Sequence, residues 1–263
     1  MIASAQPLPG SLYDYPRYYD LIFNDERARE VGFLTDCFAL YAGRPVLRVY
    51  EPACGSGRLL VDLARRGLTV VGCDINAGAV SHLNRRLRRL GLPPTAAVAD
   101  MCVVRVRPKV HAAFNLISSF QHLLTEAEAE AHLRAVASSL VRGGVYVLGS
   151  DLCPSGRRRR TSGVWTRSRG SLSITTTLRT RRVAWRRRLE VCRMRSLIRD
   201  GKTLKVIEED LRFRTYTLRQ VKRLFARVPE FEVVASYDLS YEVYSSERVD
   251  GDSRGAVFVL RRR

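Results

Sequence analysis

Short apolar runs of strand length alternate with segments that read as helices through the first half of the chain. The apolar runs cover residues 46–50, 68–73, 95–99, 113–118 and 145–148, and the helical segments cover 58–66, 77–90 and 125–140. This alternation predicts an α/β fold with a doubly wound, mostly parallel sheet that helices cover on both faces. Ligands of such sheets bind beyond the carboxyl ends of the strands, where the strand order reverses.

The pattern changes after Asp151. Between residues 164 and 214, β-branched and aromatic side chains alternate partially with polar ones, and Asp200-Gly201 is a two-residue hairpin signal. We therefore predict an inserted antiparallel β meander that serves as a lid or a dimerisation sheet. The predicted division assigns residues 1–156 and 213–263 to the main domain and residues 157–212 to the insertion.

Both ends of the chain add further elements to the main domain. Residues 11–42 read as helical, with aromatic side chains at helical spacings, and Gly43 and Pro45 end this region. Toward the C-terminus we predict a helix over 218–228, strands over 231–237 and 256–260, and a polar loop over 245–254.

The positive charge of the chain is concentrated in the predicted insertion. The formal net charge is +19, and residues 157–199 hold 15 arginines against one glutamate, a net charge of +14. Such a segment can attract nucleic acid, an anionic membrane or an acidic substrate. The whole chain, however, contains 41 Arg and only 4 Lys. A compositional bias with a solvated basic face is therefore favoured over a dedicated nucleic-acid site.

Composition also predicts where the protein works. No apolar run reaches the length of a membrane span, and the N-terminus lacks the basic and apolar regions of a signal peptide. The six cysteines are scattered without a CxxC pair, which is typical of buried, reduced thiols. We expect a cytoplasmic protein with no membrane partner.

The segment Glu51-Pro-Ala-Cys-Gly-Ser-Gly57, here called the glycine turn, connects a predicted strand to a helix. Gly55 and Gly57 allow the backbone to approach a ligand closely, and the following helix N-terminus offers free amide donors. Asp74 ends the next strand, 17 residues after Gly57, where a carboxylate can accept both ribose hydroxyls of a nucleoside. Asp100 and Met101 follow the third strand, in position for an adenine. The alternative is that these acids cap the following helices.

The glycine turn differs in two ways from the pattern of dinucleotide-binding folds, and these differences indicate which nucleoside it binds. The third glycine of G-x-G-x-x-G, which packs the helix beneath a pyrophosphate, is replaced by Leu60. Glu51 is a poor neighbour for a diphosphate but a good one for a ligand that carries an ammonium and a sulfonium group. Both differences favour S-adenosyl-L-methionine as the cofactor.

These residues resemble the first motif, E-x-x-x-G-x-G, of the class I S-adenosylmethionine-dependent methyltransferase family, in its small-molecule branch. Residues 18–22 resemble the helix that lies over the methionine end of the cofactor, and 120–124 the segment that faces the methyl group. The resemblance spans residues 13–150 and, more weakly, 213–262. It implies a Rossmann-like fold and an enzyme. The cofactor-binding residues it implies are Tyr19, Glu51, Ala53, Gly55, Gly57, Asp74, Ile75, Asp100, Met101 and Ser118.

Methyl transfer needs a base only where the acceptor loses a proton, and His122 is the candidate. It lies just past the carboxyl end of the fourth strand, although a structural, hydrogen-bonded histidine is an equal alternative. His111 lies at the wrong end of the sheet. His82 and His132 fall inside helices and are predicted at the surface. The sequence shows no metal site.

The sequence does not identify the methyl acceptor. We expect transfer to N or O of a small molecule, an anionic one if the basic insertion binds it, and the insertion allows a homodimer. The first alternative is a methyltransferase for RNA or another nucleic acid, although the proline motif of amino-directed DNA methylation is absent after the fourth strand. The second alternative is a non-catalytic binding protein that keeps the nucleotide fold.

Overall fold

The computed structural model describes residues 5–23, 27–154, 162–244 and 248–263. Its larger sheet has the strand order β11-β12-β6-β5-β2-β3-β4. Strands β2 to β6 run parallel to one another, and β12 runs antiparallel to both of its neighbours. The strands are β2 (Arg48–Pro52), β3 (Thr69–Asp74), β4 (Ala96–Val98), β5 (Val110–Asn115), β6 (Leu140–Asp151), β11 (Phe231–Tyr237) and β12 (Gly255–Arg262).

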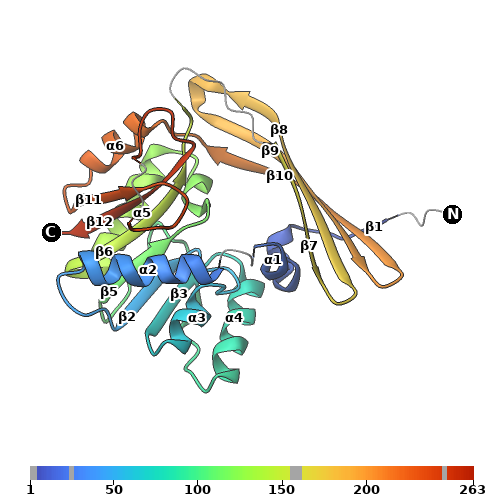
Figure 1. The fold of residues 1–263 in the computed structure, drawn as a ribbon, viewed down its shortest axis with the longest axis horizontal. Helices are drawn as coiled ribbons and strands as arrows, with labels where there is room; N and C mark the ends of the chain where they lie inside the picture. The colour runs from blue at the N-terminus through green and yellow to red at the C-terminus, as the bar shows by residue number, and fades with distance from the viewer. Residues whose placement is uncertain (1–4, 24–26, 155–161, 245–247) are drawn as a thin grey trace.

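Helices cover both faces of this sheet, as Figure 1 shows. One face buries its apolar side chains against α2 (Arg27–Tyr41), α3 (Leu60–Arg65) and α4 (Ala77–Arg89). The other face packs against α5 (Glu126–Ser139) and α6 (Leu218–Ala226). The strand order reverses between β2 and β5, which places the expected ligand site at the carboxyl ends of these two strands. The predicted doubly wound α/β fold is confirmed.

The capping box at the start of α5 is also confirmed, since the Thr125 side chain accepts from the Glu128 amide and Glu128 accepts from Thr125. The fourth strand, in contrast, was predicted over 113–118 and lies at 110–115. The apolar run continues past the strand because residues 116 and 117 turn into the ligand edge of the sheet, where they line a cavity. None of the helices in the described part of the chain combines the length and apolar character required to span a bilayer.

The inserted antiparallel meander is confirmed as a separate sheet, here called the inserted sheet, which extends away from the core (Figure 1). It consists of β7 (Ser162–Arg169), β8 (Leu172–Ala184), β9 (Leu189–Asp200) and β10 (Thr203–Arg214). The predicted hairpin between β9 and β10 is present, but its two turn residues are Gly201 (φ 58°) and Lys202, because Asp200 still pairs with Thr203. The short β1 (Gln6–Pro7) adds a parallel edge to β10, which the sequence did not predict.

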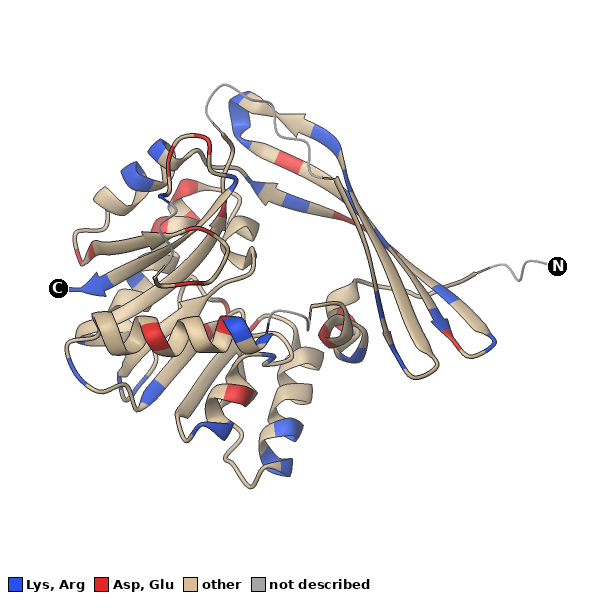
Figure 2. Cartoon of the chain, viewed as in Figure 1, with Lys and Arg blue, Asp and Glu red and all other residues tan. Residues whose placement is uncertain are grey.

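The two faces of the inserted sheet differ in character because side chains alternate along each strand. One face is apolar and packs on the turn η1 (Leu12–Asp14) and on α1 (Pro16–Ile22), which lie between the sheet and the core. The opposite face is polar, with Arg193 paired to Asp210 and Arg195 paired to Glu208. Basic residues recur along this sheet (Figure 2). The run of arginines at 157–160 lies outside the described residues.

The surface position predicted for His132 is wrong. Its side chain is 1% exposed, with Nε2 at 2.8 Å from the Tyr146 hydroxyl and Nδ1 at 3.1 Å from the Met101 carbonyl oxygen. Burial lowers the pKa of His132 to about 4, so the imidazole is neutral at pH 7. The sequence misleads here because the polar ring lies on the buried face of α5, where two hydrogen bonds satisfy it. His82 is half-buried.

Candidate active site

A cavity of about 690 Å³ lies between the ligand edge of the large sheet and the apolar face of the inserted sheet. The segment of residues 11–23, here called the strap, contributes to its wall. The structure therefore brings together most of the residues that the sequence proposed. Those that line the cavity are Tyr19, Glu51, Ala53, Gly55, Asp74, Ile75, Asp100, Met101, Ser118 and His122.

The glycine turn follows β2 and has left-handed backbone at three positions, Ala53 (φ 52°), Gly55 (φ 52°) and Gly57 (φ 73°). This conformation costs a residue with a Cβ roughly 1–2 kcal/mol, so Ala53 marks a strained point beside the cavity. The turn is held to the neighbouring strand, since the Cys54 amide donates to the Cys73 carbonyl at 2.9 Å. Its backbone is thus fixed in a shape that exposes Gly55 to a ligand.

Gly57 does not line the cavity, in contrast to the predicted cofactor contact. A Cβ built on it would lie 2.2 Å from Cδ1 of Leu83, a fully buried side chain of α4. The missing side chain at Gly57 therefore permits close packing of the turn on that helix. Gly55 has no atom within 4 Å of an added Cβ, so its free space faces the cavity.

Asp74 connects the glycine turn to the end of β3. Its Oδ2 accepts from the Gly55 amide at 2.8 Å, and its Oδ1 accepts from the Asn76 amide at 2.8 Å. Each oxygen retains a second lone pair, so the carboxylate can also accept hydroxyl groups from the cavity. The neighbouring Ile75 is 77% exposed, which is unusual for isoleucine and leaves an apolar surface for a ring.

Asp100 has a structural partner as well as a place in the cavity. Its Oδ1 accepts from the Cys102 amide at 2.8 Å, so it caps the turn after β4. Met101 beside it contributes a half-buried apolar side chain, and its carbonyl is held by His132. Asp100 thus caps a turn and not a helix, which was the alternative from the sequence, and it also lines the cavity.

Glu51 is a buried carboxylate of the cavity wall with an unpaired oxygen atom. Its Oε2 is buried and accepts no hydrogen bond from the part of the chain that the structure describes. Burial raises the pKa of Glu51 well above its ordinary value, and the nearby charges of Glu30 and Asp74 raise it further, whereas Arg58 lowers it. A cationic ligand group would supply the missing partner and charge.

Arg58 is the one arginine or lysine among the described residues that line the cavity. Its guanidinium is committed to Glu30, with Nη2 at 2.9 Å from Oε1 and a second bond from Nη1 to Oε2, and both side chains are buried. The remaining ionisable acids of the lining are Asp14, Glu51, Asp74 and Asp100. The cavity is therefore acidic and suits a cation.

Polar contacts hold the N-terminal end of the strap to both the inserted sheet and the core, and the sequence did not predict them. On the inserted sheet, Glu209 accepts from the Ser11 hydroxyl at 2.6 Å and from the Leu12 amide at 2.9 Å. On the core, Asn76 Nδ2 donates to Asp14 Oδ1 at 2.7 Å. The strap thus bridges the two sheets across the cavity. Burial raises the pKa of Tyr19 to about 12, so its hydroxyl stays protonated.

His122 ends the short helix η2 (Ser119–His122), which follows Ser118, a residue with left-handed backbone at φ 46°. Ser118 Oγ donates to Asp151 Oδ2 at 3.0 Å, which holds this strained corner. His122 Nε2 lies 3.3 Å from the Tyr13 hydroxyl of the strap, and its ring centroid lies 4.9 Å from that of Phe213. Burial lowers the pKa of His122, so the ring is neutral at pH 7 and can accept a proton.

The far wall of the cavity is apolar. Its side chains come from the strap and the inserted sheet, and they are Phe23, Trp165, Leu178, Met194, Leu211 and Phe213. Within the part of the insertion that the structure describes, the arginines do not reach this wall. The sequence failed to show this because alternation along each strand separates the apolar face from the basic one only once the register is known.

Asn115, at the end of β5, is a further residue that the sequence did not assign to the site. Its Nδ2 donates to the Pro52 carbonyl at 2.8 Å, and its buried Oδ1 has no partner within the described ranges. It lines the cavity close to the glycine turn. A polar residue that ends an apolar strand at the ligand edge was the available signal. No cluster of metal-ligating side chains occurs among the described residues.

Comparisons with known proteins agree with this geometry. Residues 49–144 match the family model described as a methyltransferase domain. The DesVI structure of Streptomyces venezuelae is similar at 17% identity and a TM-score of 0.78, covering 97% of this chain and 100% of that one. The sugar N-methyltransferase KedS8 of Streptoalloteichus is similar at 18% identity and a TM-score of 0.75, covering 100% and 99%. A search of curated proteins finds no match.

A third structure, an S-adenosylmethionine-dependent methyltransferase of Clostridium acetobutylicum, is similar at 17% identity and a TM-score of 0.76, covering 95% of this chain and 99% of that one. At such identities the structures establish the fold, whereas the family model rests on the sequence of the domain that carries the glycine turn, Asp74 and Asp100. The two findings agree. Residues 49–144 are thus similar to a methyltransferase domain, and the whole chain has the fold of solved S-adenosylmethionine-dependent methyltransferases.

Proposed function

We propose that this protein transfers the methyl group of S-adenosylmethionine to a nitrogen or oxygen atom of a small molecule. The observation that carries the proposal is that one cavity extends from the acidic glycine turn to the apolar wall of the inserted sheet. It therefore has one end for a cationic nucleoside and one for an acceptor. Structures of similar fold include the sugar N-methyltransferase KedS8 and the amino pentose methyltransferase CalS10, which supports a small acceptor with an amino or hydroxyl group.

The chain has suitable groups for each part of the cofactor. Asp74 would accept the ribose hydroxyls, and Ile75 and Met101 would flank the adenine, whose edge faces Asp100. The buried, unpartnered oxygens of Glu51 and Asn115 would accept from the ammonium group. Tyr19, Ala53, Gly55 and Ser118 complete the proposed contacts, and Gly57 acts through packing. When bound, the cofactor supplies a methyl group on a positively charged sulfur, which is already activated for displacement.

The residues of the chain contribute alignment, exclusion of water and a proton acceptor. The strap and the inserted sheet close over the acceptor, so that its nucleophilic atom can approach the methyl carbon in line with the breaking carbon–sulfur bond. As the new bond forms, the acceptor atom becomes more acidic. We propose that its proton moves to the lone pair of His122 Nε2 as the Tyr13 hydroxyl turns away from that lone pair, and that the Tyr13 oxygen then accepts from the new N–H.

The charge of the cavity lining determines which charge on the acceptor the site favours. Among the described residues, the cavity offers an anion only Arg58, which Glu30 already neutralises. An anionic acceptor, which the arginine content of the insertion suggested, would need a contact outside this lining. We propose a neutral or amino-bearing acceptor, because the carboxylates favour it.

We further propose that residues 157–212 act as a lid domain, because their apolar face forms one wall of the cavity. If two copies associate, the outer edge of β7 is the expected contact, because this strand pairs on one side only. We place the enzyme in the cytoplasm, where its five buried cysteines would remain reduced.

The His122→Gln variant is expected to lose about 100-fold in kcat while its affinity for S-adenosylmethionine is unchanged, because only the proton acceptor is removed. Burial lowers the pKa of His122, so the neutral form dominates at pH 7 and the acidic limb of wild-type kcat/KM should lie below about pH 6.5. That limb should disappear in the variant. The measurement is kcat/KM from pH 5 to pH 9.

His82→Gln is the matched control, because His82 lies on α4 and does not line the cavity. It should leave the pH profile unchanged. Near-normal turnover of His122→Gln across this pH range would assign His122 a structural role instead.

Methyl-labelled cofactor tests the proposed function directly when it is supplied with three acceptor classes, namely amino sugars, neutral hydroxylated compounds and RNA. We expect label in one of the small-molecule classes. Label confined to RNA would favour the nucleic-acid alternative, and cofactor binding without transfer to small molecules of any fractionated extract would favour a binding protein.

A further inference from the structure

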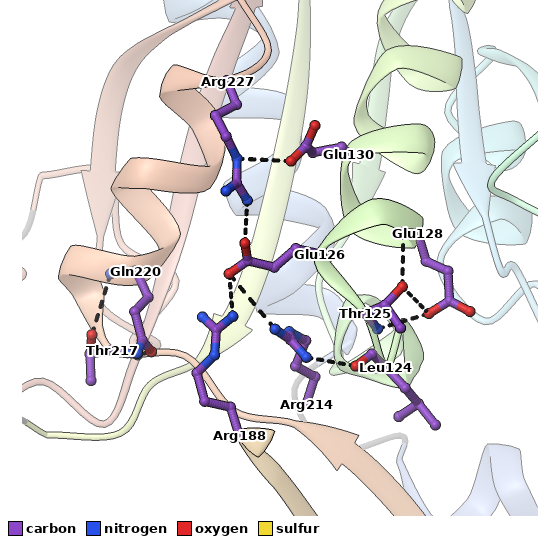
Figure 3. Close-up of polar contacts among 10 residues, drawn as sticks. All are labelled: Leu124, Thr125, Glu126, Glu128, Glu130, Arg188, Arg214, Thr217, Gln220 and Arg227. Atoms are coloured by element: carbon purple, nitrogen blue, oxygen red, sulfur yellow. Dashed lines mark hydrogen bonds and ion pairs between the residues drawn. The ribbon is translucent and has the colours of Figure 1, made fainter. Parts of the chain in front are cut away.

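Three arginines from three segments converge on one carboxylate, that of Glu126, the first residue of α5 (Figure 3). Arg227, which follows α6, donates from Nη2 to Oε2 at 2.5 Å. Arg214, the last residue of β10, has Nη2 at 3.7 Å from Oε1. Arg188, in the turn before β9, also donates to Oε1. The cluster joins the inserted sheet to the core.

Both arginines of the inserted sheet come from the same end of it. Arg214 pairs with Leu189, the residue after Arg188, and the Thr215 amide donates to the Arg188 carbonyl at 2.9 Å. Their guanidinium groups lie 5.7 and 5.6 Å from the ring centroid of the buried Tyr216. The end of the sheet nearest the core is therefore fixed to α5 through one carboxylate.

This junction adjoins the acceptor end of the cavity. Arg214 Nη1 donates to the Leu124 carbonyl at 2.7 Å, two residues after His122. On the other side of Arg214, the Phe213 ring contacts the His122 ring, and both line the cavity. A displacement of the junction would therefore shift the apolar wall relative to the proposed proton acceptor.

The negative charge of Glu126 holds the three arginines of the cluster together. Arg214 is only 8% exposed, and Glu126 is the carboxylate that the structure places within 4 Å of Arg188 and Arg214. Hydrogen bonds from Arg227 and Arg188 lower the pKa of Glu126 to about 2, so it stays ionised across the physiological range. Loss of this charge would leave two neighbouring guanidinium groups, one of them buried, to repel each other.

We propose that Glu126 is a positioning residue for the acceptor, which docks the base of the inserted sheet on α5 and so sets the distance between the apolar wall and His122. The proposal rests on the proposed function, since it assumes that the acceptor binds beneath the inserted sheet. It assigns no chemical step to Glu126, which does not line the cavity.

Glu126→Gln keeps the shape of the side chain and removes its charge. We expect the KM for the acceptor to rise about tenfold, with the Kd for S-adenosylmethionine unchanged, because the cofactor end does not contact the junction. Glu126→Asp, which restores the charge, should recover part of the acceptor affinity.

Asp210→Asn is the matched control, because Asp210 pairs with Arg193 on the polar face of the inserted sheet, which faces away from the cavity. It removes one ion-paired carboxylate from the same sheet and should leave the KM unchanged. A Glu126→Gln enzyme with a lower melting temperature but an unchanged acceptor KM would overturn the proposal, because Glu126 would then be merely structural.

Amide hydrogen exchange separates this proposal from the proposed function. In Glu126→Gln, but not in Asp210→Asn, exchange should accelerate in residues 119–124 and at the base of β9 and β10, whether or not an acceptor is known. If no small molecule is methylated, the proposed function is wrong, but hydrogen exchange still measures whether Glu126 docks the inserted sheet on α5. Unchanged exchange in these segments would overturn the docking role itself.

Discussion

Asp74→Ala is expected to weaken the binding of S-adenosylmethionine by about 10²- to 10⁴-fold. Asp74 would accept both ribose hydroxyls, and hydrogen bonds to a charged group contribute roughly 1.5–3 kcal/mol each. The same carboxylate holds the Gly55 amide at 2.8 Å, so its loss also frees the glycine turn. Isothermal titration calorimetry of the purified chain measures the effect.

Asp62→Ala is the control for this experiment. Asp62 lies on α3, outside the cavity, where it pairs with Arg27 and Arg65. Its replacement should leave cofactor affinity within about twofold, since Asp62 does not line the cavity and effects of separate sites are independent. Unchanged affinity of a folded Asp74→Ala variant would contradict the assignment of the ribose site.

Gly57→Ala is expected to destabilise the protein by roughly 2–5 kcal/mol, which combines the cost of a left-handed alanine with overpacking of a buried site. The added Cβ would lie 2.2 Å from Leu83 Cδ1, and Leu83 is fully buried. The turn and α4 would have to separate. Urea denaturation followed by circular dichroism measures the loss in the free energy of unfolding.

Gly55→Ala is the matched comparison, because Gly55 has a similar backbone conformation but no neighbour within 4 Å of the added Cβ. It should cost roughly 1–2 kcal/mol of stability, yet weaken cofactor binding, since it lines the cavity. Equal stability of the two variants would show that packing against Leu83 is not the reason why residue 57 is a glycine.

The cofactor end of the site could be predicted because its residues follow local rules. Parallel strands end at one edge of a sheet, so the glycine turn after β2 and Asp74 after β3 were expected to meet, and they do. The signal Asp200-Gly201 likewise predicted the hairpin of β9 and β10 to within one residue of its turn. In each case the signal and the structure it produces lie close together in the sequence.

The other features of the site could not be predicted, because they depend on contacts between residues that lie far apart in the sequence. Leu83, which explains Gly57, lies on a different helix, and Tyr13 meets His122 only after the strap crosses to the core. The arginine content of the insertion suggested an anionic acceptor, whereas strand register directs the described arginines away from the cavity. His132 was misplaced because its partner Tyr146 lies on a strand of the sheet.

The measurement that tests the central claim most directly is a crystal structure of the chain with S-adenosylhomocysteine, the product form of the cofactor. We expect its ribose hydroxyls within hydrogen-bond distance of Asp74 and its ammonium group beside Glu51. The sulfur atom should face the apolar wall and His122. A ligand bound elsewhere, or one whose sulfur faces away from the inserted sheet, would contradict the account.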